Sequence, residues 1–294
     1  EQIVDGPDAA TVLVDGQAIT ATWVFDSRPP RLTDQREDKR HTRLKLHFRG
    51  WEIEAQPGAF DPGGAAFMVS RTPQDGAVRF FYVLPFADNQ ALVEYTLFTD
   101  ARLTRQETEQ ALATYLQTVH GVAEFRILEE EGGCLPITDA PFARRLGKRV
   151  LAIGVRGGRI KPSTGYAFSR VQADSDAIVR SLLACGHPFE PLAEPACYRW
   201  LDAVLLRVMR THSAAVAPAF AAMFDRNPMS RILRFLDEQA TALDILSIMA
   251  SLPAPLFVGT ALQTAAAQID AGGKARQRGK QKNREAVASR PLLV

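Results

Sequence analysis

One acidic residue, Glu94, lies within an otherwise apolar run at 91–98 that reads as a β-strand. Side chains of a strand alternate between two faces, so this carboxyl points either to solvent or into a pocket. In a pocket, the loss of hydration would raise its pKa and make it a usable general acid. The residues alone favour the solvent face. A general-acid role is therefore the more specific but less favoured interpretation of Glu94.

A second candidate follows a short apolar strand at 149–155. The polar and glycine positions after it are Gly157, Gly158, Pro162, Ser163, Thr164 and Gly165. Glycines let a backbone approach a ligand closely, and the apparent helix start at 162–164 would offer unpaired N–H groups to an anion. A flavin or phosphate site needs this arrangement, although a plain strand-to-helix turn explains the spacing equally well. It is not a GxGxxG fingerprint, and the sequence contains none.

Asp26 is a third candidate, because it directly follows a strand and precedes Ser27 and Arg28. An acid at a strand end can hold a hydroxyl of a cofactor. More often it accepts hydrogen bonds from the backbone of a turn. The residues alone favour the turn.

The histidines and cysteines give no sign of a metal site. The five histidines have no metal-like spacing, and Cys134, Cys185 and Cys197 form no CxxC pair. We therefore predict no metal and no disulfide framework, as in a reducing compartment. The cysteines are expected to be small buried apolar residues.

Composition indicates a folded chain with little excess charge. Of 294 residues, 46% are hydrophobic and 23% charged, and the formal net charge is +2, which argues against a nucleic-acid-binding surface. No apolar run reaches the roughly 18 residues that a membrane-spanning helix needs. The basic residues of 274–290 belong to a tail at 269–294 that we expect to be disordered.

The first half of the sequence reads as strands joined by turns. Runs at 11–14 and 18–25 flank Asp15-Gly16, a hairpin signal. Further strands are expected at 44–55, 65–71, 79–85, 91–98 and 122–130, around a charged loop at 31–40. Thr104 and Glu107 form a capping box that predicts a helix up to His120. Beyond Ser163 the pattern is helical almost to Leu252, with breaks expected near Pro188, Pro191, Pro195, Pro218 and Pro228.

Taken in order, these segments resemble the lycopene cyclase family of flavoproteins. The matching pieces are FDSRP at 25–29, GWEIE at 50–54, FFYVLPF at 80–86, ALVEYT at 91–96, LPIT at 135–138, KPSTGY at 161–166, FDRNP at 224–228 and LRFLDE at 233–238. Each piece is weak by itself. Their shared order over roughly residues 10–262 makes the resemblance specific.

The resemblance implies an α/β (α+β) two-part flavoprotein fold. It places the end of an FAD-binding part at 1–30 and an antiparallel substrate-binding sheet with one helix at 31–145. A second FAD-binding segment follows at 146–185, a helical cap at 186–268 and the basic tail at 269–294. The sequence starts in mid-pattern, so we expect it to lack most of the N-terminal Rossmann unit, which a separate FAD-binding half could supply.

The chemistry that the resemblance implies is cyclisation of the ψ-ends of lycopene to β-ionone rings, an isomerisation by an intramolecular lyase. Glu94 matches the glutamate proposed as acid and base in the family, which reverses the preference stated above. Reduced FAD assists, with NAD(P)H as the electron source. Asp26, Gly157, Gly158, Pro162, Ser163, Thr164 and Gly165 match segments that hold FAD. No metal is implied.

Two internal positions depart from the family pattern. Val69 stands where relatives often carry an acid, and Arg156 replaces a small residue before the double glycine. A long cation there would either clash with the flavin or pair with a phosphate. Both departures bear on whether this chain turns substrate over.

Two other readings stay open at this point. One is a related flavin monooxygenase or reductase acting on another apolar substrate. The other is a catalytically inactive remnant that binds a carotenoid or a partner chain. For the cyclase, the expected partners are lycopene or another apolar carotenoid and a peripheral membrane surface, with no nucleic acid. The expected location is the cytoplasmic side of a membrane.

Overall fold

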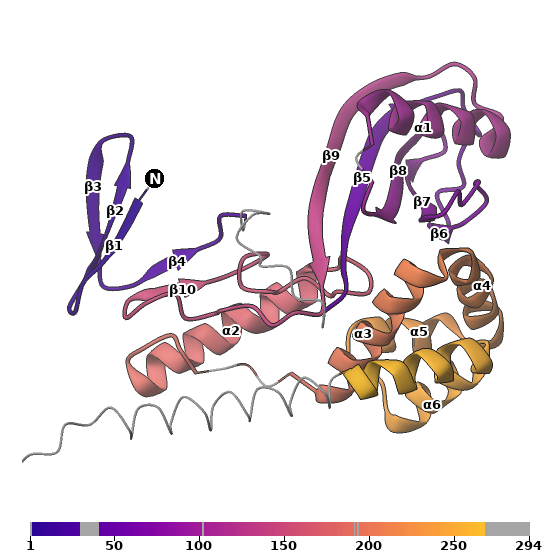
Figure 1. Cartoon of the computed structure of the whole chain (residues 1–294). Helices are drawn as coiled ribbons and strands as arrows, with labels where there is room; N and C mark the ends of the chain where they lie inside the picture. The colour runs from indigo at the N-terminus through magenta and orange to yellow at the C-terminus, as the bar shows by residue number, and fades with distance from the viewer. Residues whose placement is uncertain (1, 30–40, 102, 191, 193, 268–294) are drawn as a thin grey trace, which may run out of the picture.

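The computed structural model describes residues 2–29, 41–101, 103–190, 192 and 194–267 (Figure 1). The charged loop expected at 31–40 and the basic tail expected at 269–294 lie outside the described residues. The described chain combines strands and helices, as the α/β (α+β) class requires. Its largest element is a five-stranded sheet, from which the candidate site is built.

The five-stranded sheet is antiparallel and has the strand order β6-β7-β8-β5-β9. Its strands are β5 (Arg43–Glu54), β6 (Ala66–Val69), β7 (Val78–Ala87), β8 (Gln90–Thr99) and β9 (Arg126–Thr138). Alternating apolar residues predicted most of these strands, because one covered face gives a period of two. The predicted antiparallel sheet is therefore confirmed.

Helix α1 (Arg105–His120) covers one face of this sheet (Figure 1). Thr104 and Glu107 form the expected capping box, and Gly121 ends the helix in the left-handed conformation. Beneath the helix, the Phe81 ring stacks on Tyr115 at 3.9 Å and on Tyr95 at 4.8 Å between centroids. This aromatic stack fills the first core of the molecule.

The described strands also form two smaller sheets. The hairpin predicted around Asp15-Gly16 joins β2 (Ala10–Val14) to β3 (Gln17–Ala21), and β1 (Gln2–Asp5) pairs with β2. Strand β4 (Val24–Asp26) pairs in parallel with β10 (Val150–Ala152). This parallel pair places Asp26 next to the glycine segment that follows β10.

Helices make up most of the second half. They are α2 (Phe168–Cys185), α3 (Ala196–Thr211), the short 3₁₀ helix η2 (Ser213–Ala215), α4 (Val216–Arg226), α5 (Met229–Leu236), α6 (Ala242–Ser251) and a last helix at Ala254–Ala267. Helices α3 and α4 contact β5 and β7. Among the described residues, no single helix is long and apolar enough to cross a membrane.

Two local predictions were wrong. Helix α2 begins at Phe168 rather than at 162–164, because Gly165 takes φ +81° and Lys161 N–H bonds Tyr166 O, which closes a turn. Strand β9 begins at Arg126 rather than Val122, because Val122 N–H satisfies Leu116 O at the end of α1. The break expected near Pro218 falls before it, between the end of α3 at Thr211 and the start of α4 at Val216, because Pro218 lies in the first turn of α4, where its missing N–H costs nothing.

The expectation of buried cysteines was also wrong. Cys134, Cys185 and Cys197 are all exposed, and all are free thiols. Each occupies a position set by secondary structure, on the strand β9, at the last residue of α2 and in the first turn of α3. Residue type alone does not reveal which way such a side chain points.

Removal of the central ring of the aromatic stack tests this core. Phe81 is 1% exposed, so Phe81→Ala is expected to lower the free energy of unfolding by about 3–5 kcal/mol. The matched control is Phe86→Ala on the same strand, where the ring is 57% exposed and the expected change is below about 0.5 kcal/mol. Urea unfolding followed by tryptophan fluorescence measures both. Equal losses in the two variants would contradict the assigned faces of β7.

Candidate functional site

Glu94 lies on the face of the sheet opposite α1. Three strands place side chains around it, because residues directly opposite each other across neighbouring strands share a face. Gly50 of β5 lies opposite Glu94 of β8, and Tyr82 of β7 lies opposite Glu94 from the other side. On the outer strand β9, Glu131 lies opposite Gly50. The two carboxyls are therefore separated across the sheet only by a glycine.

The Glu94 carboxyl is partly buried and hydrogen-bonded. Thr96 Oγ1 donates to Glu94 Oε1 at 2.5 Å. Burial raises the pKa of Glu94, and the charge of Glu131 and a hydrogen bond with its side chain raise it further, while the Thr96 bond opposes the shift. A carboxyl that keeps its proton toward neutral pH can act as a general acid. The partial burial of Glu94 argues against a fully solvated side chain, the alternative that the residues alone favoured.

Gly50 leaves the space that Glu131 occupies. A Cβ atom at Gly50 would lie 2.8 Å from both Cγ and Oε1 of Glu131. Any side chain at position 50 would therefore push the Glu131 carboxyl aside. The exposed Glu131 reaches across the strand β5 toward Glu94 because its neighbour has no side chain.

Two tyrosines border the acid on its other side. Tyr82 Oη and Tyr166 Oη lie 2.8 Å apart, and the charge of Glu94 acts on both. Burial raises the pKa of Tyr82 far above its usual range and that of Tyr166 to about 12, so both phenols stay neutral. The Phe67 ring packs 5.4 Å from Tyr82 and 5.9 Å from Phe224. Aromatic faces of this kind attract a cation.

The turn that carries Tyr166 packs directly on the sheet. A Cβ atom at Gly165 would lie 2.5 Å from Cδ1 of Leu46, so only glycine permits this approach. Ser163 and Thr164 are buried, and Pro162 lines a cavity beside them. The structure thus brings the predicted segment at 162–165 onto the same face of the sheet as Glu94, with Tyr166 as the link.

Gly157 and Gly158 lie on the wall of a cavity of about 530 Å³ that also reaches Pro162, Arg170, Trp200 and Asp202. Its volume is within the range of small-molecule sites. The amides of the two glycines, however, donate to Ile153 O at 3.0 Å and Val155 O at 3.1 Å. The turns of the loop therefore already use the two N–H groups that a phosphate would need.

Asp26 is buried and held by the chain's own arginines. Its Oδ1 accepts the backbone N–H of Arg28, and the Arg28 guanidinium bonds both carboxylate oxygens at 2.9 Å. Arg156 Nε lies 3.0 Å from Oδ2. These partners, the hydrogen bond from Arg28 first, hold the pKa of Asp26 below its usual value. The turn expected from the residues alone is present, and Arg156 pairs with Asp26.

Lys161 fixes the segment to the helical cap. Its ammonium is 3% exposed and lies 3.2 Å from Asp202 of α3 and 2.9 Å from Glu238, just after α5. Arg170 of α2 bonds the same Glu238 oxygen at 2.8 Å. Burial raises the pKa of Asp202 against the opposing charge of Lys161. The position of the turn at 162–166 therefore depends on charged partners in the cap.

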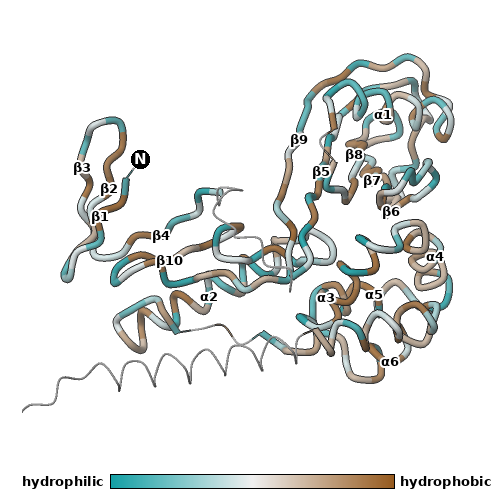
Figure 2. The backbone as a smooth tube through the Cα atoms, in the orientation of Figure 1, coloured by the Kyte–Doolittle hydropathy of each residue, from teal (hydrophilic) through white to brown (hydrophobic). Residues whose placement is uncertain are grey.

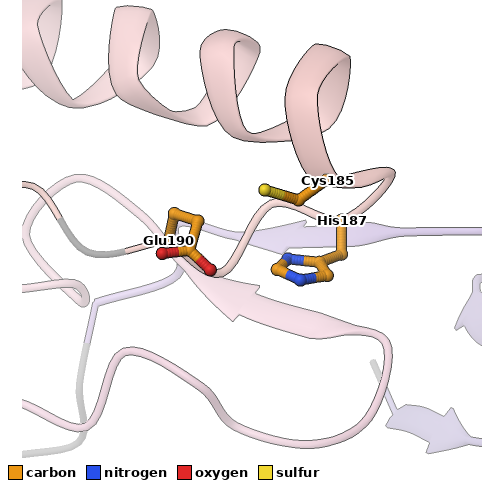
Figure 3. Close-up of side chains that lie close together, drawn as sticks. All are labelled: Cys185, His187 and Glu190. Carbon is orange, nitrogen blue, oxygen red and sulfur yellow. The ribbon is translucent and has the colours of Figure 1, made fainter.

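A separate group of donors forms at the end of α2. Cys185, His187 and Glu190 have ligand atoms within 4.8 Å of one another (Figure 3). Thiolate, imidazole and carboxylate are ligands that zinc takes, and the histidine spacing alone did not reveal this group. The 18 residues of α2 separate it from the Tyr166 turn by about 27 Å at 1.5 Å per residue. It adds no ligand to the Glu94 site.

The sequence alone did not point to several of the residues around Glu94. Tyr82 and Tyr166 lie inside matched segments but were read as strand and turn positions only. Thr96 follows Glu94 by two residues, which puts it on the same face of β8. Glu131 closes an acidic run at 129–131, for which a solvated strand end is the simplest interpretation. Only the strand register reveals that Gly50 stands between two carboxyls.

Comparison with known proteins identifies a similar fold and the family of this chain. The chain adopts the fold of a geranylgeranyl bacteriochlorophyll reductase-like protein from Thermoplasma acidophilum, with TM-score 0.52 and 11% identity over 89% of this chain and 68% of that one. The family model for lycopene cyclase proteins matches residues 1–262. The chain belongs to the lycopene cyclase family.

Individual relatives agree with this assignment at low identity. A lycopene beta-cyclase of Pantoea ananas is 28% identical over 265 residues, which is 85% of this chain and 66% of that protein. A lycopene beta-cyclase of Pseudescherichia vulneris is 27% identical over 175 residues, 58% of this chain and 43% of the relative. The chain thus spans less than two thirds of the length of these curated relatives.

The buried lysine gives a direct test of how the segment is held. Lys161→Met leaves Asp202 buried without its cation, so we expect a loss of about 3–5 kcal/mol in the free energy of unfolding. The double variant Lys161→Met with Asp202→Leu is expected to regain most of that loss. Lys148→Met, at an exposed position, is the control. Denaturant titration of the four proteins measures this, and a loss below about 1 kcal/mol for Lys161→Met would contradict the described ion pairs.

Proposed function

We propose that this chain is a lycopene β-cyclase-like enzyme of carotenoid biosynthesis, an isomerase that closes the ψ-ends of lycopene into β-ionone rings. The observation that carries the proposal is Glu94, a partly buried carboxyl with a raised pKa on an aromatic-walled face of the sheet. Family membership supplies the substrate class. Relatives named lycopene beta-cyclase support it further.

The proposed reaction needs an acid, a place for a cation and a base. Glu94 gives its proton to the terminal double bond of the ψ-end, whose electron pair forms the new C–H bond. The tertiary cation is attacked by an internal double bond, which forms the ring C–C bond. A ring proton then leaves to a carboxylate, so atoms and electrons balance and no net redox change occurs.

The aromatic residues beside Glu94 suit this cation. Phe67, Phe80 and Tyr82 form edge-to-face contacts, with ring centroids 5.3 and 5.4 Å apart. Rings of this type stabilise a desolvated cation by about 2 kcal/mol or more. Because Tyr82 and Tyr166 stay neutral, neither phenol adds a competing negative charge or a competing base.

Reduced FAD is the proposed cofactor, with NAD(P)H as its electron source, and both rest on the family. When bound, an anionic reduced flavin supplies negative charge near the cation. The residues at 157–165 fit such a group only in part, since they border a cavity of about 530 Å³ while the amides of Gly157 and Gly158 are already hydrogen-bonded within the loop. The steps assigned to Glu94 do not depend on it.

An apolar polyene also needs an apolar path. A cavity of about 210 Å³ lies between β6, β7 and α4, lined by Met68, Val69, Phe80, Phe220 and Phe224. A second, of about 260 Å³, lies among the helices of the cap. We assign the first to the substrate chain, because Phe80 and Phe224 also belong to the aromatic group beside Glu94.

We propose two partners for the enzyme, a membrane surface and a FAD-binding half. A carotenoid is delivered from lipid, so we place the enzyme in the cytoplasm as a peripheral membrane protein that docks through the cap. We also propose that a FAD-binding half, on the same or a separate chain, packs against the parallel pair β4–β10. Parallel strands occur in sheets covered on both faces, whereas Phe25 of β4 is 41% exposed.

Pigment analysis tests the activity. A lycopene-accumulating bacterium expresses this chain alone or together with a FAD-binding half, in each case as wild type and as Glu94→Gln. We expect γ- or β-carotene from the wild type and at least about a hundredfold less from Glu94→Gln, because the amide cannot donate the proton. Glu107→Gln, at the exposed start of α1, is the control. Unchanged lycopene in every arm would favour the inactive-remnant reading instead.

Membrane docking is tested on the exposed leucines of α6. Leu243 is 75% exposed and Leu246 is 65% exposed, on an apolar helix that appears brown in Figure 2. Replacement of both by Glu is expected to lower binding to phosphatidylcholine–phosphatidylglycerol vesicles by on the order of tenfold or more. Co-sedimentation measures the bound fraction. The control is Leu183→Glu on α2, a leucine that is even more exposed at 84%, and an equal loss there would contradict docking through α6.

A further inference from the structure

The second carboxyl at the site, Glu131, belongs to no motif of the resemblance. It reaches the acid because three strands align at one level of the sheet. Gly50 pairs with Glu94 on one side and with Glu131 on the other. The Glu131 side chain crosses the space that a side chain at Gly50 would fill, with Cγ and Oε1 each 2.8 Å from that Cβ position, and bonds the Glu94 carboxyl.

Two carboxyls in hydrogen-bond contact share a proton, because like charges so close do not both ionise. The groups that face Glu94 are Glu131 from β9, Tyr82 from β7 and Tyr166 from the turn before α2. Both phenols are neutral, and Thr96 of the same strand donates to Glu94. Among these neighbours, Glu131 is the other carboxyl and therefore the natural partner for proton exchange with Glu94.

We propose that Glu94 and Glu131 work as a proton-sharing pair across Gly50, in which Glu131 keeps the acid loaded and takes back the proton that the reaction releases. This inference rests on the proposed cyclase function. It assigns to Glu131 the base role that a single glutamate would otherwise have to play after it has just acted as acid.

The pair gives up one proton and takes back one proton in each cycle, so no proton from solvent is needed. Glu94 starts protonated and Glu131 starts as a carboxylate. Glu94 loses its proton to the substrate carbon, the ring closes, and the ring C–H proton leaves to Glu131. The hydrogen bond between the carboxyls then returns that proton to Glu94, so both groups end as they began.

Solvent access distinguishes the two members. Glu94 is partly buried, whereas Glu131 is exposed at the edge strand of the sheet. The less hydrated carboxyl keeps the proton and the better hydrated one keeps the charge. The difference in solvent exposure therefore assigns the role of acid to Glu94 and the role of base to Glu131.

The first experiment is a titration of Glu94 in the full chain, which needs neither substrate nor flavin. Glutamate carries ¹³C at the carboxyl, and the Glu94 signal is assigned by its loss in Glu94→Gln. We expect a lower Glu94 pKa in Glu131→Gln than in wild type, because both the neighbouring charge and its hydrogen bond are altered. Glu129→Gln, two residues away on the same strand with the same charge change, is expected to leave the Glu94 pKa unchanged.

Gly50→Ala provides a second, independent variant. Its Cβ displaces only the flexible Glu131 side chain, so the fold is expected to persist while the carboxyls separate. The Glu94 pKa is again expected to fall. An unchanged Glu94 pKa in both Glu131→Gln and Gly50→Ala would overturn the pair, whatever the activity.

The second readout is pigment formation in the lycopene-accumulating host. Glu131→Gln is expected to lower ring formation by about tenfold or more at neutral pH and to move its pH optimum downward, while Glu129→Gln matches wild type. Equal product from Glu131→Gln and wild type would overturn the base role. A wild type that makes no ring, with the titration shifts intact, would refute the proposed function while leaving the carboxyl pair established.

Discussion

The contact between Gly165 and Leu46 is the constraint on which the site depends. It lets the turn at 162–166 lie directly on the sheet, where Tyr166 bonds Tyr82. These two phenols then cover one side of Glu94 and remove water from it. A side chain at position 165 would lift the turn and admit water, and the carboxyl would ionise near its ordinary pKa. Acid strength at Glu94 is thus set by a packing contact of another residue.

Electrostatics in the cap hold that turn in place. Lys161 comes immediately before it and is buried between Asp202 and Glu238, so α3 and the end of α5 fix its position. A buried ion pair is weak evidence for stability, but it specifies one arrangement because any other leaves a charge unpaired. The cap that would meet the lipid and the turn that covers the acid are therefore connected through three charged side chains. In the proposed reaction, carotenoid entry and proton transfer would both depend on this region.

Features encoded by local residue patterns were predictable, and features encoded by register were not. The Asp15-Gly16 hairpin and the Thr104–Glu107 capping box follow from dihedral preferences and short-range hydrogen bonds, and both are present. The start of α2 was missed because the residue types that form the turn at 162–166 are also typical of a helix start. Glu131 was missed because its partner lies 37 positions earlier in the chain, on a strand separated from it by β5.

The two departures from the family pattern have local explanations that leave Glu94 intact. Val69 pairs with Phe81 across β6 and β7 and packs against the core beneath α1, and it also lines the small cavity that we assign to the substrate chain. An acid at position 69 would meet that apolar core, so the valine removes a costly buried charge. Arg156 is paired with Asp26 at the far edge of the glycine segment. Neither substitution touches the carboxyl pair, and acid–base chemistry at Glu94 therefore depends on Gly50, Glu131 and the tyrosine cover.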